Sequence, residues 1–176
     1  MIDKLAYSLA VGIKNVVPEH PASIARLKYA LSFILNAGFI IFLSLLLSIF
    51  TGKTGQVATL LFAFALLRQV SGGIHLKSGT MCVLATVSTA TVLSFVTYPD
   101  MYTLIITSIS IVIVLLYAPS GIENQTRIPP KYYPLLKLVS VLLVSSNFVI
   151  ESKMTSIAFL VQSLSLIIPR KEVNSK

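Results

Sequence analysis

Six apolar runs, separated by short polar breaks, constrain the fold of this chain more than any other feature of its sequence. The breaks carry glycine, proline or polar residues, which end helices. Because 55% of the 176 residues are hydrophobic and only 11% are charged, a soluble domain of this length would lack the polar residues to cover its surface. The sequence therefore predicts an integral membrane protein, with runs at residues 29–50, 56–67, 80–97, 101–118, 135–150 and 154–168.

The lengths of these runs indicate how often the chain crosses the bilayer. A helix needs roughly 20 residues to cross about 30 Å of hydrocarbon. The first, third and fourth runs approach that length, whereas the second, fifth and sixth must extend into flanking polar residues or cross a thinned bilayer. We therefore expect an all-α, polytopic membrane protein with about six transmembrane helices between residues 29 and 168.

The basic residues predict the orientation of these helices, because lysine and arginine concentrate in cytoplasmic loops. If the N-terminus is inside and there are six crossings, only Lys53 and Lys153 of the 14 basic residues fall in outside loops. A five-span or re-entrant arrangement would place one half of these charges on the wrong face. We expect a multi-pass membrane protein with both termini and residues 68–82 in the cytoplasm.

The N-terminal segment, residues 1–20, has apolar residues at helical spacing and no convincing secretory signal. This pattern predicts an amphipathic helix that lies on the membrane surface, although packing against other protein explains it equally well. The apolar positions of this N-terminal helix are Ile2, Leu5, Leu9, Ile13 and Val16, with Lys4 and Lys14 among the others.

No repeat or long linker divides the chain, so we expect one domain over residues 1–176, with a cytoplasmic tail at 169–176.

The charge and the metal-ligating residues exclude some function classes. The net charge is +8, but no run of lysine and arginine with interleaved aromatics indicates nucleic acid, and anionic membrane lipid is the expected partner. Zinc sites require three or four protein ligands, whereas this chain has one cysteine, two histidines and few carboxylates. We expect no metal and no cofactor. The single cysteine also excludes an internal disulfide.

The reactive residues concentrate in one stretch, RQVSGGIHLKSGTMC, at residues 68–82. An imidazole near a thiol can take the thiol proton, so that the thiolate attacks a carbonyl and the imidazolium protonates the leaving amine. His75 and Cys82 would be about 10 Å apart along the axis of one continuous helix, which is too far for contact. Glycines at 72, 73 and 79 weaken a helix on both sides of the histidine. We therefore expect an irregular segment that brings imidazole and thiol together.

Cys82 is expected in the first turn of the third span, after Ser78 or Thr80 as the N-cap. The N–H groups and the dipole at a helix N-terminus stabilise anions, which would favour a thiolate and could hold the oxyanion of a tetrahedral intermediate. Taken alone, a single cysteine in an apolar protein is more often an inert buried residue, and a histidine at a membrane edge is usually just solvated. The residues by themselves leave both interpretations open.

The same stretch resembles the accessory gene regulator B (AgrB) family of bacterial quorum-sensing membrane peptidases. A second segment, YAPSGIENQTRIP at residues 117–129, is similar to the family's Tyr-Ala-Pro loop and the polar, proline-ended stretch that follows it. The order of the apolar runs extends the resemblance over most of the chain. The pattern that carries it is R-x-x-x-G-G-x-H-x-x-x-x-x-x-C, formed by Arg68, Gly72, Gly73, His75 and Cys82.

The resemblance implies a cysteine endopeptidase without cofactors, in which His75 and Cys82 are catalytic. It would release the C-terminal tail of an AgrD-like precursor of an autoinducing peptide and hold the remainder as a thioester. An internal cysteine or serine of the precursor would then close a thiolactone or lactone ring. Precursors in this family carry an amphipathic leader and an acidic tail, and a homodimer is one assembly that the resemblance allows.

Supporting roles are expected for the residues around the pair. Arg68 could bind a peptide carboxylate or extend to the membrane surface, and Gln69, Glu123 or a backbone carbonyl could orient His75. Basic inside loops could attract the acidic tail, although the positive-inside rule explains them equally well.

Two other functions compete: a small peptide exporter that does not cleave, and a structural membrane protein with an idle thiol. The scarcity of intramembrane charged residues argues against transport.

Overall fold

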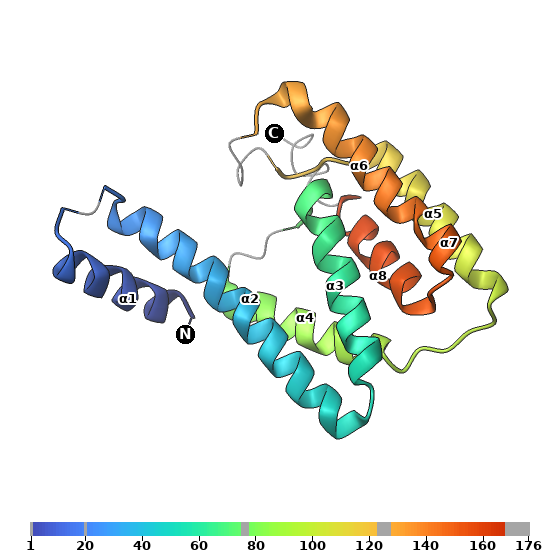
Figure 1. The fold of residues 1–176 in the computed structure, drawn as a ribbon, viewed down its shortest axis with the longest axis horizontal. Helices are drawn as coiled ribbons and strands as arrows, with labels where there is room; N and C mark the ends of the chain where they lie inside the picture. The colour runs from blue at the N-terminus through green and yellow to red at the C-terminus, as the bar shows by residue number, and fades with distance from the viewer. Residues whose placement is uncertain (1, 20, 75–77, 123–127, 168–176) are drawn as a thin grey trace. The chain divides into compact units, whose positions relative to one another are not determined.

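A computed structural model describes residues 2–19, 21–74, 78–122 and 128–167 (Figure 1). Within these ranges the regular structure is helical, apart from one isolated bridge between Gly72 and Ser120, and this confirms the all-α expectation. The helices are α1 Ile2–Val16, α2 Ile24–Thr51, α3 Thr54–Ser71, α4 Gly79–Leu93, α5 Met101–Tyr117, the 3₁₀ turn η1 Pro130–Tyr132, α6 Tyr133–Ser145, α7 Asn147–Ile150 and α8 Lys153–Leu164.

Each of the six apolar runs forms a helix, but the helices differ in whether they could cross a membrane. Two helical stretches are long and apolar enough to do so: α2, and Pro130–Ile150, which comprises η1, α6 and α7. The helices α4 and α5 are apolar but shorter. At 12 residues, α8 is about 18 Å long and much of it is buried inside the protein. Six crossings therefore remain a prediction.

The chain divides into two compact units, each described by itself. Unit 1 comprises residues 1–52 and 76–91, and unit 2 comprises residues 53–75 and 92–176. The division passes through the stretch of residues 68–82, so Arg68 belongs to unit 2 and Cys82 to unit 1. The single-domain expectation stays a prediction.

In unit 1, α1 packs along α2 through a face of small and apolar residues. Ala6 and Ala10 are fully buried there, and small side chains permit close approach of two helices. The predicted amphipathic helix therefore exists and contacts protein on one face. Its remaining apolar positions are exposed and so are available to a membrane surface: Leu5, Leu9, Ile13 and Val16.

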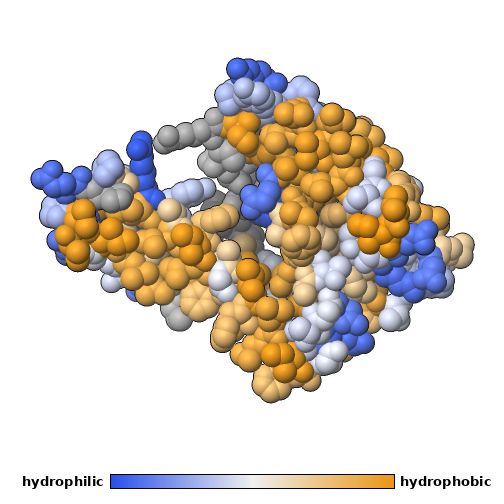
Figure 2. Space-filling model, in the orientation of Figure 1, coloured by the Kyte–Doolittle hydropathy of each residue, from blue (hydrophilic) through white to orange (hydrophobic). Residues whose placement is uncertain are grey.

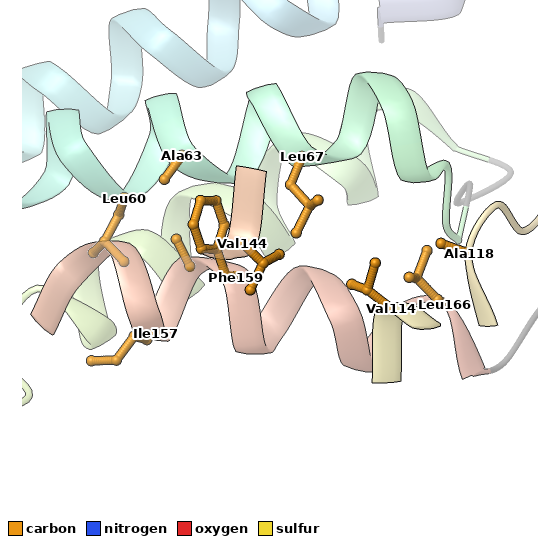
Figure 3. Packing of buried hydrophobic residues seen from close by; sticks show 10 residues of the cluster. Leu60, Ala63, Leu67, Val114, Ala118, Val144, Ile157, Phe159 and Leu166 are labelled. Carbon is orange, nitrogen blue, oxygen red and sulfur yellow. The ribbon is translucent and has the colours of Figure 1, made fainter. Parts of the chain in front are cut away.

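In unit 2, α8 is the central helix, in contact with α3 and α5 (Figures 1 and 3). Its side chain Phe159 lies in a core to which α3 contributes Leu67, α5 Val114 and α6 Val144. The opposite faces of the surrounding helices are apolar and exposed, and Figure 2 shows an extended hydrophobic surface over α6. A helix with apolar residues on both its core face and its outer face is typical of a protein that lipid surrounds.

The connections after α2, α4 and α7 contact one another in unit 2, and the charge pattern assigns all three to the same side of the membrane. The Lys53 ammonium lies 5.8 Å from the centre of the Phe95 ring, and the Lys153 ammonium lies 2.7 Å from a carboxylate oxygen of Asp100. The Tyr98 hydroxyl donates to the Lys153 carbonyl at 3.0 Å. These contacts join the breaks after α2, α4 and α7. The breaks after α3 and α5 meet elsewhere in unit 2, where α8 ends.

Candidate functional site

The helix α3 ends within the predicted glycine pair. The last helical residue, Ser71, is followed by Gly72 at φ 77° and ψ −139° and by Gly73 at φ 124°. Side chains other than glycine rarely adopt these angles, so the pair ends the helix before His75. The next helix, α4, begins at Gly79. The prediction that no single helix carries both His75 and Cys82 is confirmed.

The segment after α5 packs directly on this glycine pair. The Gly73 N–H donates to the Ser120 carbonyl at 2.8 Å, and the Ser120 N–H donates to the Ser71 carbonyl at 3.0 Å. A Cβ atom at Gly72 would overlap the Ser120 carbonyl and lie 2.7 Å from Cγ1 of Ile122. The glycine is therefore required by backbone approach as well as by its own φ. The two segments that carry the family resemblance are hydrogen-bonded to each other.

A glutamine that the sequence reasoning missed holds the same backbone from the other side. Gln162 of α8 is fully buried, and its Nε2 donates to the Gly72 carbonyl at 2.6 Å and to Oγ of Ser71 at 3.1 Å. The Ser165 hydroxyl donates to the Gln162 carbonyl at 2.7 Å and to its Oε1 at 3.3 Å. An amide in the middle of the sixth apolar run was the available signal, because a buried amide requires partners.

Arg68 bonds to the backbone immediately before His75. Its Nη2 donates to the carbonyl of Ile74, and its guanidinium lies 5.8 Å from the centre of the Phe64 ring. The side chain is half-buried, whereas the neighbouring Gln69 is exposed. A guanidinium carries five N–H donors, so this bond leaves open whether Arg68 also binds a peptide carboxylate.

Cys82 lies in the first turn of α4, as predicted, and its side chain is half-buried. Its N–H donates to the Ser78 carbonyl at 3.1 Å, which places the cysteine four residues into the helical hydrogen-bonding pattern. The start of α4 packs closely on α2, since a Cβ atom at Gly79 would lie 2.7 Å from Oδ1 of Asn36. The thiol is thus held on a packed helix end.

Two of the predicted site residues, His75 and Glu123, lie outside the described residues. The structure therefore tests neither the pairing of His75 with Cys82 nor a role for Glu123 in orienting the imidazole. It brings together Arg68, Gly72 and Gly73. Among the described residues, no group of three or more histidine, cysteine, aspartate or glutamate side chains could hold a metal.

Comparison with known proteins agrees with the resemblance in the sequence. The sequence model of the family described as Accessory gene regulator B matches residues 2–168. An AgrB-like protein of Halalkalibacterium halodurans is 28% identical over 110 residues. That alignment covers 62% of this chain and 56% of the relative's length. No solved structure matches the chain.

Proposed function

The chain belongs to the accessory gene regulator B family, and we propose that it is a membrane-embedded cysteine endopeptidase of quorum sensing. Its substrate would be an AgrD-like precursor peptide, and its product the cyclic autoinducing peptide. His75 and Cys82 are the catalytic pair in this proposal. The family match supports a part in the accessory gene regulator system, and the cysteine chemistry is our inference from the residues.

The observation that carries the proposal is the interruption between α3 and α4. The first helix ends at Ser71 and the second begins at Gly79, so His75 falls between the two helices in the sequence and Cys82 lies in the first turn of the second. The separation of about 10 Å that one continuous helix would impose therefore does not apply. Contact between the imidazole and the thiol is part of the proposal, because general acid–base catalysis requires hydrogen-bond reach.

The first chemical step is acyl transfer from the precursor to the enzyme. The imidazole of His75 takes the thiol proton, and the Sγ atom of Cys82 attacks the carbonyl carbon of the scissile bond. As the C–N bond breaks, the imidazolium returns the proton to the leaving amine of the tail. The product is a thioester between Cys82 and the shortened precursor, which preserves the acyl activation that hydrolysis would lose.

The second step closes the ring. An internal cysteine or serine of the precursor gives its proton to His75 and attacks the thioester carbonyl, and the released thiolate of Cys82 recovers that proton. The overall reaction exchanges one peptide bond for one thioester or ester bond and a free tail. Water must compete poorly for the thioester, and a site at the edge of the membrane would limit its access.

The contacts in unit 2 support the six-span orientation, which is also part of the proposal. Breaks that the charge pattern places outside the cell contact one another through Lys53, Tyr98 and Lys153. The segments around Gly72 and Ser120, predicted to be cytoplasmic, bond to each other. Alternation of the helices across a membrane would produce this grouping. The active site would then face the cytoplasm, where an unprocessed precursor is available.

Reconstitution with the precursor tests the proposal. The substrate is a synthetic AgrD-like precursor with an amphipathic N-terminus and an acidic tail, and mass spectrometry follows release of the tail. Cys82→Ala and His75→Ala should each abolish release, whereas Met81→Ala, an exposed neighbour in the same turn, should retain it. A peptide adduct on Cys82 that hydroxylamine removes would support the thioester.

The same experiment separates the competing functions. Tail release that continues in both Cys82→Ala and His75→Ala would exclude cysteine peptidase chemistry. Export of uncleaved peptide that neither substitution changes would instead favour a transporter with an idle thiol.

A further inference from the structure

The backbone that leads to His75 is held by bonds from three parts of unit 2. The Ser120 backbone bonds to Ser71 and Gly73, Arg68 bonds to the Ile74 carbonyl, and the Gln162 amide bonds to the Gly72 carbonyl. We infer that Gln162 is a positioning residue for the proposed reaction, because it holds the glycine pair that precedes His75 in the sequence. The inference rests on the proposed function, since it assigns Gln162 a role through His75.

Both the nitrogen and the oxygen of the Gln162 side-chain amide have hydrogen-bond partners, and these partners orient the group. The two N–H groups of Nε2 have two acceptors, the Gly72 carbonyl and Oγ of Ser71. The Ser165 hydroxyl, on the residue directly after α8, donates to Oε1 at 3.3 Å and so distinguishes the oxygen from the nitrogen. The whole side chain is buried. An amide in this environment has one favourable orientation, because any other leaves buried polar groups without partners.

The glycine pair requires this support because glycine itself does not restrict the backbone. Gly72 and Gly73 have the largest range of accessible φ and ψ of any residue type, so their observed angles must be maintained by neighbours. Gly73 is also packed against α8: a Cβ atom there would lie 2.6 Å from Oγ of Ser165 and 3.2 Å from Nε2 of Gln162. The end of α8 thus forms one wall of the turn that precedes His75.

A second buried amide provides a matched control for this role. Asn147 is also fully buried, and its Nδ2 donates to Oγ1 of Thr107 at 3.0 Å while its Oδ1 accepts from the Ser152 N–H at 3.2 Å. It fixes the connection between α7 and α8, which makes none of the described contacts with the glycine pair. Loss of either amide should lower the stability of unit 2, but only loss of Gln162 should disturb His75.

The experiment measures how fast iodoacetamide alkylates Cys82 at pH 7 in detergent micelles. Cys82 is the chain's single cysteine, so mass spectrometry reads its modification without ambiguity, and no peptide substrate is required. A thiol without an activating base is only a few per cent thiolate at this pH, so removal of the imidazole can slow alkylation by about tenfold or more. The alkylation rate of the His75→Ala protein gives the rate expected when the imidazole is absent. Rates after denaturation should be equal in all variants.

Gln162→Leu should slow alkylation of the folded protein by about tenfold, since a displacement of about 1 Å at a reacting group can cost a factor of one hundred. Asn147→Leu should retain the parent rate even though it is also destabilised. If His75→Ala slows the reaction and folded Gln162→Leu does not, the positioning role is wrong and the proposed pair stands. If His75→Ala leaves the rate unchanged, the proposed pair fails and the role of Gln162 fails with it.

Two neighbouring serines decide the question if Gln162→Leu does not fold. Ser165→Ala removes the hydroxyl that orients the Gln162 amide and should slow alkylation by about threefold to fivefold. Ser163→Ala removes a hydroxyl on the same helix that bonds to the carbonyls of Phe159 and Ser110, and it should leave the rate unchanged. Equal rates in the two serine variants would overturn the inference.

Discussion

Replacement of Gly72 by alanine is the sharpest test of how the turn before His75 is built. The added Cβ atom would overlap the Ser120 carbonyl and lie 2.7 Å from Cγ1 of Ile122. The first of these is backbone that bonds to Ser71 and Gly73, so it cannot move without loss of those bonds. Alanine would also have to adopt a φ of 77°, which glycine tolerates and other residues rarely do.

The expected loss of stability follows from these two effects. A residue held at such angles costs about 1–3 kcal/mol, and an extra carbon in a packed site costs about 1–3 kcal/mol through displaced neighbours. The costs overlap, because one movement of the backbone can relieve both. We therefore expect Gly72→Ala to lower the free energy of unfolding by about 3 kcal/mol and to abolish tail release, since the displaced backbone leads to His75.

Reversible unfolding in mixed micelles, followed by circular dichroism, measures the change in stability. Gly55→Ala is the matched control, because it lies on the same helix α3 and its Cβ atom would meet nothing within 4 Å. There alanine should be neutral or stabilise by about 0.5–1 kcal/mol through its higher helix propensity. A Gly72→Ala protein as stable and active as the Gly55→Ala protein would show that the turn before His75 does not require glycine at position 72.

Two further predictions concern packing inside each unit, one in unit 2 and one in unit 1. Asn147→Leu should lower the free energy of unfolding of unit 2 by about 2 kcal/mol, because Thr107 and the Ser152 backbone lose a buried partner; an unchanged unfolding midpoint would contradict this. Ala6→Asp should place a charge in the contact between α1 and α2 and speed hydrogen exchange along α1, whereas the exposed Ser8→Asp should leave exchange unchanged. Equal exchange in both variants would show that α1 does not depend on this contact.

The N-terminal helix illustrates how far a sequence pattern can be interpreted. The spacing of Ile2, Leu5 and Leu9 correctly predicts a helix, and it leaves open whether lipid or protein covers the apolar face. In the structure, protein covers the edge of that face formed by Ala6 and Ala10 and leaves the leucines exposed. Ile2 of the predicted face is buried as well, but alanine contributes little to an apolar pattern, so the pattern did not indicate two of the residues that make the contact.

The apolar runs predict where the helices lie, but they do not predict which helices cross the membrane. Apolar runs locate the helices because burial or lipid must cover apolar side chains, and all six runs are helical. Whether a run crosses the membrane depends on whether lipid or protein surrounds it, and the residues of the run do not indicate which. The sixth run forms α8, a short helix that carries Gln162 and packs among α3 and α5.

The helical class, the family and the interruption around the glycine pair could all be predicted from the sequence. These follow from local properties, namely hydrophobic content, motif spacing and the backbone freedom of glycine. That Ser120 and Gln162 hold this pair became evident only from the packed structure, because hydrogen bonds between residues 47, 49 and 90 positions apart leave no periodic signal in the chain. The residues with reactive side chains could be identified from their chemistry. The residues that hold the turn before His75 became visible only when the helices were packed.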